Sequence, residues 1–382
     1  MLKKITLRNF KSFRDSTFEL APLTLMVGAN ASGKSNFVDA LRFLQGCARG
    51  LTLSEIFSGK WEGGQQVWPP IRGGEREIFH LSANVKKCET GINWELTDSG
   101  NKYNGSYFIE IGLSDKSPAL LHERMVVGDE EYNSEFPEVG ENVVANLFAL
   151  QIFTVGRRKL QNAAPVLRNW LKDFHFLNPM PSHMRDYVSI NRPEIGIQGE
   201  NLSAMLFKLI STPDQRRTVL GWVQELCPQE IADFDFIETK LGDVLLAVKE
   251  PNGVIISARS MSDGTLRFLA IIAALLTAKE GTTFIIEEID NDLHPARLHL
   301  LVGFLEQVTA SRKIQVIAST HSPYFLDHLS EESLKSVLVF HRDSQSAETK
   351  ATKLVDIPGF PEARKNMPLD LMHASSWMEQ NL

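Results

Sequence analysis

The sequence predicts an α/β protein whose core is assembled from the two ends of the chain. Near the N-terminus, an apolar strand-like run over 23–27 leads into a glycine-rich loop and a helix-like run over 36–50. Toward the C-terminus, the apolar run over 284–286 ends in Glu287 and Glu288, and another helix-like segment follows. Because strands and helices alternate at both ends, the middle of the chain is expected to be an insertion in one α/β core.

Composition is that of an ordinary globular protein. The 382 residues are 43% hydrophobic and 23% charged, which suits one large domain or two modest ones. No apolar run reaches the ~18 residues of a membrane span, and the N-terminal segment lacks the apolar stretch of a signal peptide. We therefore expect a cytoplasmic protein without membrane contact.

Cysteine usage and charge exclude two further classes. Cys47, Cys88 and Cys227 have neither a metal-binding spacing nor an even number for disulfides, so we expect buried thiols in a reduced compartment. The net charge is −7, which gives no general sign of nucleic-acid binding. The basic clusters at 157–159 and 216–217 are interpreted as solvated faces, with a nucleic-acid footprint as the alternative.

The first half of the chain is expected to be rich in strands. A strand over 3–10 precedes the one over 23–27, and the Gly-, Pro- and Trp-rich segment 51–75 is interpreted as a long surface loop. The acidic stretch 128–141 is interpreted as a solvated loop. An antiparallel subsheet is expected from three strand-like segments, 78–87, 106–114 and 120–128.

The second half combines helices and short strands. Helices are expected over 160–177, 200–211, 214–227, 262–281 and 295–309. Strands are expected over 234–240, 244–250, 253–259 and 314–320. The strand over 314–320 should neighbour the strand that ends in the two glutamates, whereas the tail beyond Glu348 is weakly patterned.

The segment from Gly28 to Ser35 fits the phosphate-binding pattern G-x-x-x-x-G-K-[ST], between a strand and a helix as the motif requires. Its glycines let backbone N–H groups close around a phosphate chain. Lys34 would reach the β- and γ-phosphates, and the Ser35 hydroxyl would ligate Mg²⁺. A chance glycine-rich turn is the alternative, and the strand–loop–helix context disfavours it.

The two glutamates complete a Walker B pattern. Glu287 would hold Mg²⁺, and Glu288 would orient or deprotonate the attacking water. A surface strand end with two solvated carboxylates is the alternative, and the apolar run before them disfavours it. His321 follows the neighbouring strand, and its position favours a γ-phosphate contact over a plain surface histidine.

Ser262, Asp263, Gly264 and Thr265 open a strongly apolar helix. Helix capping by Ser262 explains part of this pattern. A helix N-terminus with exposed amides is also a phosphate site. Since the chain already has one phosphate-binding loop, this second site would serve the nucleotide of another protomer.

As a set, these motifs resemble the ABC-type ATPases of the RecF/SMC/OLD branch, and most closely the bacterial ATPases called AAA_21. The resemblance rests on the Walker motifs, "SDGT", "LHP" and "STHSP", and on four further segments: "LRNFKSF", "IRGG", "PMPSHMRD" and "QGENLSAMLFKL". It covers about residues 1–345. It implies an ABC-ATPase head, that is, a P-loop core sheet with an antiparallel β subdomain, plus an inserted, mostly helical lobe. The expected boundaries are 1–180 and 261–345 for the ATPase, 181–260 for a helical/β insert and 346–382 for a tail.

The resemblance also implies a head-to-tail homodimer that encloses two ATP molecules with Mg²⁺. Catalysis would use Glu288, His321 and Lys34, and the metal would be held by Ser35 and Glu287. The residues expected at the nucleotide are Gly28, Asn30, Ala31, Ser32, Gly33, Lys34, Ser35, Asn36, Lys11 and Ser12, with Ser262 and Gly264 supplied by the partner subunit.

Some positions depart from the family pattern. Glu287 replaces the commoner Asp, and Asp292 stands where relatives often have Gly. The loop that links the two lobes should lie within 178–186, where no glutamine occurs. No long heptad array occurs, and the segment after His321 shows no acidic metal-binding cluster, so we expect an ATPase that lacks coiled-coil arms and a nuclease of its own.

Three functions fit this pattern. The first is an ATPase that regulates a separately encoded effector, such as a nuclease, in anti-phage defence. The second is a RecF-like DNA-repair or DNA-binding ATPase that acts without a dedicated effector; any DNA binding is expected to be independent of sequence. The third, a transporter subunit, is disfavoured because the signature "SDGT" is short and the inserted middle is large.

Overall fold

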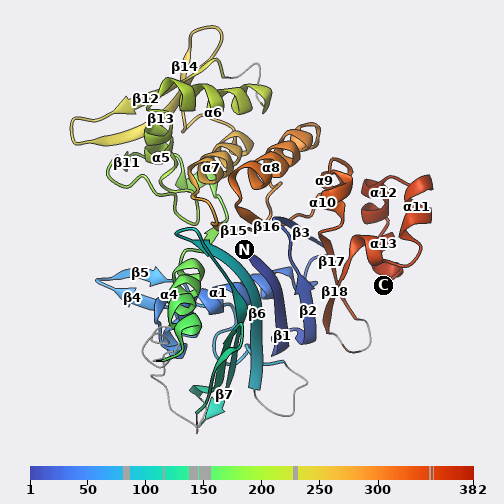
Figure 1. Ribbon diagram of the computed structural model, residues 1–382. Helices are drawn as coiled ribbons and strands as arrows, with labels where there is room; N and C mark the ends of the chain where they lie inside the picture. Colours follow the sequence, from blue (N-terminus) through green and yellow to red (C-terminus); the bar gives the residue numbers. More distant parts are fainter. Residues whose placement is uncertain are drawn as a thin grey trace.

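The centre of the molecule is a six-stranded sheet in the order β10-β15-β16-β3-β17-β18 (Figure 1). The computed structural model describes residues 1–80, 87–114, 117–136, 145, 156–226, 231–343, 346 and 348–382. The five strands from β10 to β17 are parallel, and β18 runs antiparallel to β17. Their bounds are β10 His175–Leu177, β15 Thr283–Ile286, β16 Gln315–Ser319, β3 Leu23–Val27, β17 Val337–Arg342 and β18 Thr349–Lys353. The predicted pairing of the strands that precede Glu287 and His321 is confirmed.

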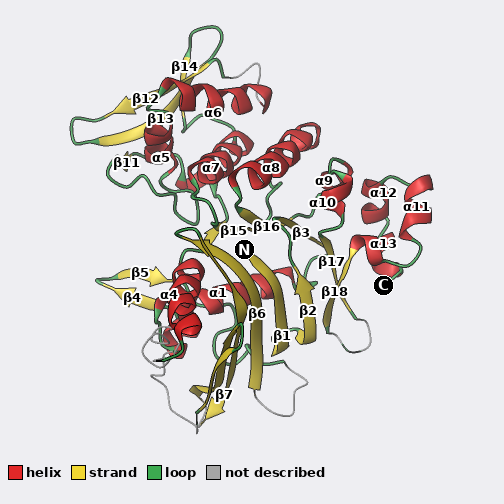
Figure 2. Ribbon diagram, viewed as in Figure 1, coloured by secondary structure: helices red, strands yellow, loops and turns green. Residues whose placement is uncertain are grey.

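A second six-stranded sheet, entirely antiparallel, has the order β2-β1-β6-β7-β8-β9 and forms the lower lobe (Figure 2). Its strands are β1 Leu2–Phe10, β2 Phe13–Glu19, β6 Lys87–Asp98, β7 Asn101–Ser114, β8 Ser117–Val127 and β9 Glu130–Glu135. This is the antiparallel subdomain that the resemblance implied, and it is larger than the three predicted strands.

Apolar side chains form two cores on opposite faces of the central sheet, because successive residues of a strand point to opposite faces. Phe284 and Ile286 of β15 join the core under α7 (Asp263–Thr277) and α8 (Leu298–Arg312). Ile285 joins the core that contains α1 (Lys34–Arg49) and the antiparallel sheet. Each such buried side chain contributes about 1.5–3 kcal/mol, so both faces fix the sheet at the strand end that carries the glutamates.

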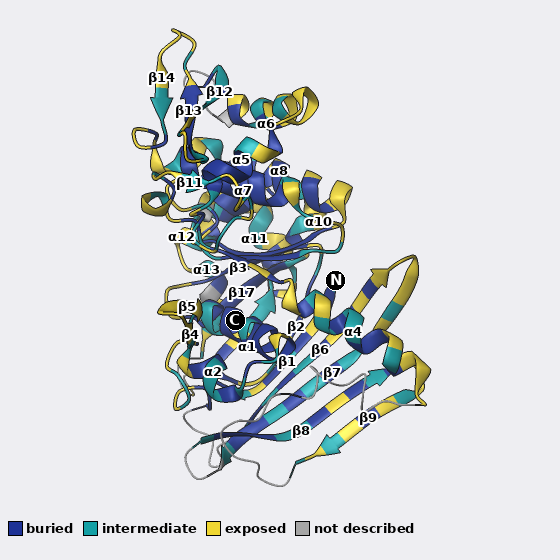
Figure 3. Ribbon diagram, turned by 90° about the vertical axis from the view of Figure 1, so that its left-hand side faces the viewer, coloured by how far each residue is buried: buried dark blue, intermediate teal, exposed yellow. Residues whose placement is uncertain are grey.

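The insert between β10 and α7 contains both helices and strands, and it forms the top of the molecule (Figure 3). Helices α5 (Leu202–Leu209) and α6 (Pro213–Leu226) lie beside a small antiparallel sheet. The strands of that sheet are β11 Val188–Ser189, β12 Asp233–Glu238, β13 Asp243–Lys249 and β14 Ile255–Ser257. The helices expected at 200–211 and 214–227 and the three strands after them are thus confirmed, with Cys227 outside the described residues.

The surface loop predicted for 51–75 was wrong in part. A short helix, α2 (Leu53–Ser58), begins at a capping box in which Thr52 and Glu55 bond each other's backbone N–H, and it buries Leu53, Ile56 and Phe57. A hairpin of β4 (Lys60–Glu62) and β5 (Gln65–Trp68) follows. The capping box was present in the sequence and could have been recognised.

Three other boundaries differ from the predictions. The acidic stretch begins with strand β9, and residues 137–141 lie outside the described part. The helix predicted over 160–177 is α4 (Arg158–Lys172), which ends before β10 because His175–Leu177 pairs with β15 in the core sheet. The segment 295–309 starts as a 3₁₀ turn at Pro295–Arg297 and continues as α8. Of the strand predicted over 78–87, residues 81–86 are not described.

The C-terminal region is folded onto the core. Strand β18 extends the central sheet, and apolar side chains such as Leu369, Met372 and Met378 are buried in the core under α7 and α8. Its short helices are α9 Pro323–Asp327, α10 Glu331–Leu334, α11 Phe360–Asn366, α12 Leu369–Ala374 and α13 Trp377–Gln380. Cys47 and Cys88 are buried, as predicted. Within the described part of the chain, every helix is too short or too polar to cross a bilayer.

Candidate functional site

The phosphate-binding loop connects β3 to α1 at the carboxyl edge of the central sheet. Gly28 and Gly33 have φ angles of 139° and 106°, which side-chain-bearing residues rarely adopt. A Cβ atom on Gly28 would lie 2.1 Å from the Phe340 carbonyl oxygen, and one on Gly33 would lie 2.3 Å from Thr349 Oγ1. Both glycines are therefore required by close packing against the β17–β18 hairpin as well as by backbone conformation.

Lys34 is folded over its own loop. Its ammonium donates to the carbonyl oxygens of Gly28 at 2.7 Å and Ala29 at 3.0 Å, and to Ser32 Oγ at 3.4 Å. The residue is 6% exposed. Helix α1 has no side-chain cap at Gly33, so its first amides remain available to an anion. This loop can therefore offer a lysine and backbone N–H groups to phosphate oxygens.

The predicted metal ligands face each other. Ser35 Oγ lies 3.3 Å from Glu287 Oε2, although the two residues are 252 positions apart in the chain. A hydroxyl and a carboxylate fit Mg²⁺, which prefers oxygen ligands and keeps several waters. Among the described residues no group of three or more His, Cys, Asp or Glu could hold a metal ion. A cation here would therefore need further oxygen ligands, such as phosphate, water or an amide side chain.

Arg72, which the sequence analysis did not select as a site residue, lies beside this pair. Its guanidinium donates to the Ser35 carbonyl oxygen at 2.7 Å and to both oxygens of Asp39, and it lies 3.7 Å from Glu287 Oε2. The motif "IRGG" was quoted only for the family resemblance. It was also the available signal for an arginine at the metal ligands.

Lys11 and Ser12 lie near the first turns of α1, but Lys11 is not free to meet a nucleotide in this structure. Its ammonium bonds Asp39 Oδ2 at 2.5 Å and the Arg72 carbonyl oxygen at 2.7 Å. Burial lowers the pKa of Lys11, and Asp39 opposes that shift. Ser12 Oγ accepts from Asn36 Nδ2 at 2.7 Å. Lys11 therefore helps to hold the backbone of Arg72 beside Asp39 of α1.

Glu288 follows Glu287 in a left-handed backbone conformation, with φ 49°. Its backbone N–H donates to Ser319 Oγ at 3.0 Å, and its carboxylate accepts from Asn291 Nδ2 at 2.8 Å. Such a conformation costs on the order of 1–3 kcal/mol in a residue other than glycine, so the surroundings must hold it. The effect is to turn the exposed carboxylate of Glu288 away from the path of β15.

His321 lies after β16, at the same edge of the sheet. Partial desolvation of the ring and the charge of Lys34 lower the pKa of His321, while Glu288 and Asp290 oppose the shift. A pKa below the ordinary value of 6.5 leaves the imidazole neutral at pH 7. Gly28–Ser35, Glu287, Glu288 and His321 thus share one edge of the sheet, which we call the Walker edge.

Arg267 of α7 connects the elements around Glu288. The residue is 4% exposed, and its guanidinium donates to the carbonyl oxygens of Pro179 at 2.5 Å and Glu288 at 3.0 Å. Burial lowers the pKa of Arg267, and the carboxylate of Asp292 is the strongest opposing influence. The sequence analysis read Arg267 only as part of an apolar helix, since nothing nearby in the sequence marks its distant partners.

Ser262 caps α7, which confirms the helix-capping part of the interpretation of this segment. Its Oγ accepts from the Thr265 backbone N–H at 3.2 Å. Ser262 and Gly264 line a cavity of about 340 Å³, which we call the signature pocket. The pocket is lined by Ser262, Gly264, Thr265, Asp292, Leu293, His294 and Arg297. The signature residues therefore lie beside the loop after Walker B, and they do not line the Walker edge.

Gly264 permits the loop after Walker B to approach α7. A Cβ atom at this position would lie 2.3 Å from the Asp292 carbonyl oxygen. Asp292 itself has φ 60°, in the region that glycine favours. The structure therefore accommodates Asp292 at the turn where relatives often carry glycine.

The loop between the lobes begins beside Glu287. Strand β10 ends at Leu177, whose carbonyl oxygen accepts from the Glu287 backbone N–H at 3.2 Å. Asn178 follows and is therefore next to Glu287 at the carboxyl edge. Segment 178–186 contains no glutamine, and its sequence alone does not reveal that Asn178 follows a strand beside Walker B.

Comparison with known proteins agrees with this arrangement. The family model AAA_21, described as "AAA domain, putative AbiEii toxin, Type IV TA system", matches residues 23–327. The chain belongs to the AAA_21 family. A segment of 55 residues, 14% of the chain, is 49% identical to the chromosome partition protein Smc of Halothermothrix orenii and covers 5% of that protein. The chain therefore spans a small part of the length of that relative.

Solved SMC heads resemble this AAA_21 chain over most of its length. An SMC head bound to the C-terminal winged-helix domain of ScpA covers 92% of the chain and 96% of its own, with a TM-score of 0.57 and 15% identity. The Thermotoga maritima SMC head has a TM-score of 0.45, 13% identity and coverage of 92% and 98%. A Pyrococcus furiosus SMC head has a TM-score of 0.47, 14% identity and coverage of 96% and 99%. The chain thus has the fold of an SMC head domain.

Proposed function

We propose that this AAA_21 protein binds and hydrolyses ATP at the Walker edge. The observation that carries the proposal is the 3.3 Å approach of Ser35 Oγ to Glu287 Oε2, next to a phosphate-binding loop with open amides. These groups lie outside the carboxyl ends of parallel strands, where α/β sheets bind their ligands. Ser35 and Glu287 would hold Mg²⁺, whose charge stabilises the transferred phosphoryl group.

Lys34 would exchange its bonds to Gly28 and Ala29 for phosphate oxygens. The exchange replaces neutral acceptors with charged ones, which form stronger hydrogen bonds with an ammonium. Arg72 lies close enough to Glu287 to respond to the same charge. Asn178 would be the polar ligand contributed by the loop between the lobes.

Glu288 is the proposed general base. Its carboxylate is exposed and can accept a proton from water, while Arg267 and Ser319 hold its backbone on both sides. His321, neutral at pH 7, would donate an N–H to the γ-phosphate. The bond between Asn291 and Glu288 would have to loosen for the carboxylate to turn toward a water molecule.

A second protomer is proposed to complete the site. Ser262 and Gly264 lie in the signature pocket, away from the Walker edge of their own chain. In a head-to-tail pair, each signature pocket would face the γ-phosphate held by the other subunit. ATP would then hold two subunits together, and hydrolysis would release them.

We further propose that this cycle regulates a separately encoded effector in bacterial anti-phage defence. The family name refers to a toxin–antitoxin system, and one solved SMC head is bound to ScpA, so related proteins act with partners. Basic residues suggested DNA as an alternative ligand, but Lys159 pairs with Asp129 at 2.6 Å and Arg216 with Asp233 at 2.9 Å. These acidic neighbours weaken the case for a RecF-like DNA-binding surface there.

Phosphate release by purified protein with ATP and Mg²⁺ tests the proposal. Glu288→Gln should bind ATP with unchanged affinity and hydrolyse it at least about 100-fold more slowly, as expected for loss of a general base. Glu280→Gln is a matched control, because Glu280 pairs with Lys313 at 2.9 Å on the loop before β15. Wild-type turnover by Glu288→Gln would contradict the assignment.

A further inference from the structure

One carboxylate oxygen of Glu287 is approached both by a proposed metal ligand and by a cation of the chain. Ser35 Oγ lies 3.3 Å from Glu287 Oε2, and Arg72 Nη2 lies 3.7 Å from the same oxygen. Because N–H···O hydrogen bonds are about 2.7–3.2 Å long, this guanidinium is an ion-pair partner of Glu287 without a direct hydrogen bond. Positive charge supplied by the chain itself therefore lies beside the oxygen that is proposed to hold Mg²⁺.

Arg72 is held in this place through its side chain and its backbone. Nη2 donates to the Ser35 carbonyl oxygen at 2.7 Å, and the guanidinium bonds both carboxylate oxygens of buried Asp39. The Lys11 ammonium bonds Asp39 Oδ2 at 2.5 Å and the Arg72 carbonyl oxygen at 2.7 Å. The side chain of Arg72 is nevertheless 53% exposed, which leaves the guanidinium room to withdraw toward solvent.

A second arginine, Arg42, also acts on Glu287 but is fixed more firmly. It lies on α1 three residues after Asp39, a spacing that places both side chains on one face of the helix. Burial lowers the pKa of Arg42, and the charge of Glu287 is the strongest opposing influence. The Arg42 guanidinium lies 5.0 Å from the centre of the Phe176 ring, which is a cation–π contact. Of these two arginines Arg72 is the exposed one, so it is the one that can give way to another cation.

Mg²⁺ and the Arg72 guanidinium compete for Glu287. A divalent ion held by Ser35 and Glu287 would lie within a few ångströms of the guanidinium, and like charges at such distances repel each other. Without nucleotide, nothing offsets this repulsion. The phosphates of ATP bring several negative charges to the phosphate-binding loop, so the metal that arrives with them meets a smaller obstacle.

We propose that Arg72 is an internal counter-ion of Glu287, which keeps Mg²⁺ from the site until the metal arrives with ATP. Free Mg²⁺ then binds weakly and the complex of Mg²⁺ with ATP binds well, which is a positive coupling between the two ligands. The inference rests on the proposed metal site of Ser35 and Glu287, and it adds control over when that site is filled.

Mn²⁺ without nucleotide is the probe, because it takes the same oxygen ligands as Mg²⁺ and its free concentration is measured by electron paramagnetic resonance. Arg72→Gln should bind Mn²⁺ at least about fivefold more tightly than the wild-type protein, since a unit charge a few ångströms from a divalent ion has at least this effect. Arg72→Lys retains the charge and should stay within about twofold of wild type. The gain in Arg72→Gln should shrink at high salt, which screens an exposed charge.

A gain in affinity separates this role from a structural one, because a disturbed fold would weaken metal binding. The gain should also depend on Glu287. In a Glu287→Gln background, Arg72→Gln should change the affinity for Mn²⁺ by less than about twofold, since the two side chains form one pair.

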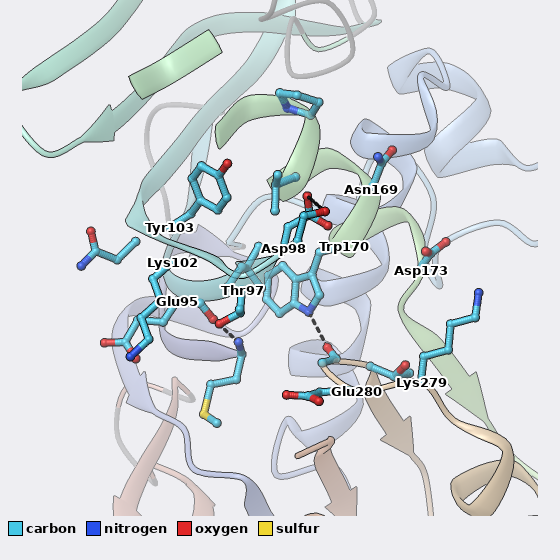
Figure 4. Close-up of a pocket in the computed structure, with 18 of the residues that line it drawn as sticks. Glu95, Thr97, Asp98, Lys102, Tyr103, Asn169, Trp170, Asp173, Lys279 and Glu280 are labelled. Carbon is cyan, nitrogen blue, oxygen red and sulfur yellow. Dashed lines mark hydrogen bonds between the residues drawn. The ribbon is translucent and has the colours of Figure 1, made fainter. Parts of the chain in front are cut away.

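Two control variants remove a positive charge elsewhere. Arg124→Gln breaks an ion pair with Glu131, and the Arg124 side chain is 49% exposed, which is close to the value for Arg72. Lys102→Gln removes a charge from the groove of about 1140 Å³ between the β6–β7 hairpin and α4 (Figure 4), and the lining of that groove includes neither Arg72 nor Glu287. Neither control should change the affinity for Mn²⁺ by more than about twofold.

The possible failures are distinguishable. Equal Mn²⁺ affinity of wild type and Arg72→Gln, together with binding that Glu287→Gln abolishes, would overturn the counter-ion and leave the metal site standing. Binding that does not depend on Glu287, or no binding by Arg72→Gln, would contradict the metal site and the counter-ion with it. A gain of the same size in Arg124→Gln or Lys102→Gln would assign the effect to net charge and would also overturn the proposal.

Discussion

The Walker edge and the signature pocket hold very different shares of a nucleotide site. At the Walker edge, residues from distant parts of the chain meet: Ser35 faces Glu287, and Lys34 influences His321. In the signature pocket, the Ser262 hydroxyl bonds Thr265, within its own helix turn. Among the described residues, no hydrogen bond or ion pair joins Ser262 or Gly264 to the phosphate-binding loop. One chain therefore brings together the residues proposed to hold phosphate and metal, whereas its signature residues line a separate pocket.

The largest effect is expected from a substitution that disrupts only the signature pocket. In the Glu288→Gln background, Ser262→Arg should weaken ATP-induced association at least about 30-fold, because a buried unpaired cation at an interface costs several kcal/mol. ATP binding by the monomer should be nearly unchanged. Sedimentation with and without ATP measures both. Ser211→Arg, an exposed change between α5 and α6, is the control, and unchanged association of Ser262→Arg would refute the role in a partner's site.

A smaller effect is expected from the residue that connects the two regions. Arg267→Ala removes the donor to the buried Pro179 carbonyl oxygen and to the part-buried one of Glu288, so the free energy of unfolding should fall by about 1–3 kcal/mol. The rate of hydrolysis should fall about tenfold, which corresponds to ~1.4 kcal/mol in the barrier, while the KM for ATP changes little.

Two variants distinguish an effect of Arg267 on the position of Glu288 from an effect on overall stability. Arg267→Lys should recover part of the rate, since it retains a donor. Arg312→Ala also removes an arginine bond to a carbonyl oxygen, that of Ala278, but at an exposed site, and it should leave the rate unchanged. A loss of KM alone in Arg267→Ala would show that the arginine serves binding and not the position of Glu288.

The smallest effect is expected from a substitution at the Walker edge, and it concerns the pKa of His321. Burial is the first cause of the lowered pKa of His321 and the Lys34 charge is the second, so Lys34→Met should raise that pKa toward its ordinary value without restoring it fully. Titration of the imidazole by NMR measures the shift. Because the folded pKa is lowered, the contribution of neutral His321 to stability is present above pH 6.5 and is lost as pH falls through the folded pKa. Lys313→Met, at the opposite end of β16, should leave the pKa of His321 where it is.

The sequence predicted those parts of the site whose chemistry is local. The phosphate-binding loop is one uninterrupted segment between a strand and a helix, and the glutamates follow an apolar strand, so spacing alone identified them. The strand β10 was missed because three residues, His175–Leu177, follow a helix without a turn signal, and only pairing with β15 makes them a strand.

Residues that act through long-range contacts could not be found this way. Lys11 reaches Asp39, and Arg267 reaches Pro179 across 88 positions, yet neither residue has a local pattern that marks its partner. Lys11 was therefore assigned to the nucleotide by resemblance, where the structure shows it bonded to a carboxylate. Strand β2 escaped for a different reason: five of its seven residues are polar or charged and exposed or half-exposed, and β1 supplies its pairing.

The central claim is that the Walker edge of one chain works with the signature pocket of another. Mixing Glu288→Gln and Ser262→Arg proteins tests it most directly, because each variant alone should be inactive. In a mixed pair, the Ser262→Arg chain keeps an intact Walker edge and receives an intact signature pocket from its partner. Phosphate release should reappear on mixing. It should reach at most about a quarter of the wild-type rate, because random pairing makes half of the dimers mixed and each mixed dimer has one intact site of two. A mixture that stays as inactive as its components, or a Ser262→Arg protein that is active alone, would contradict it.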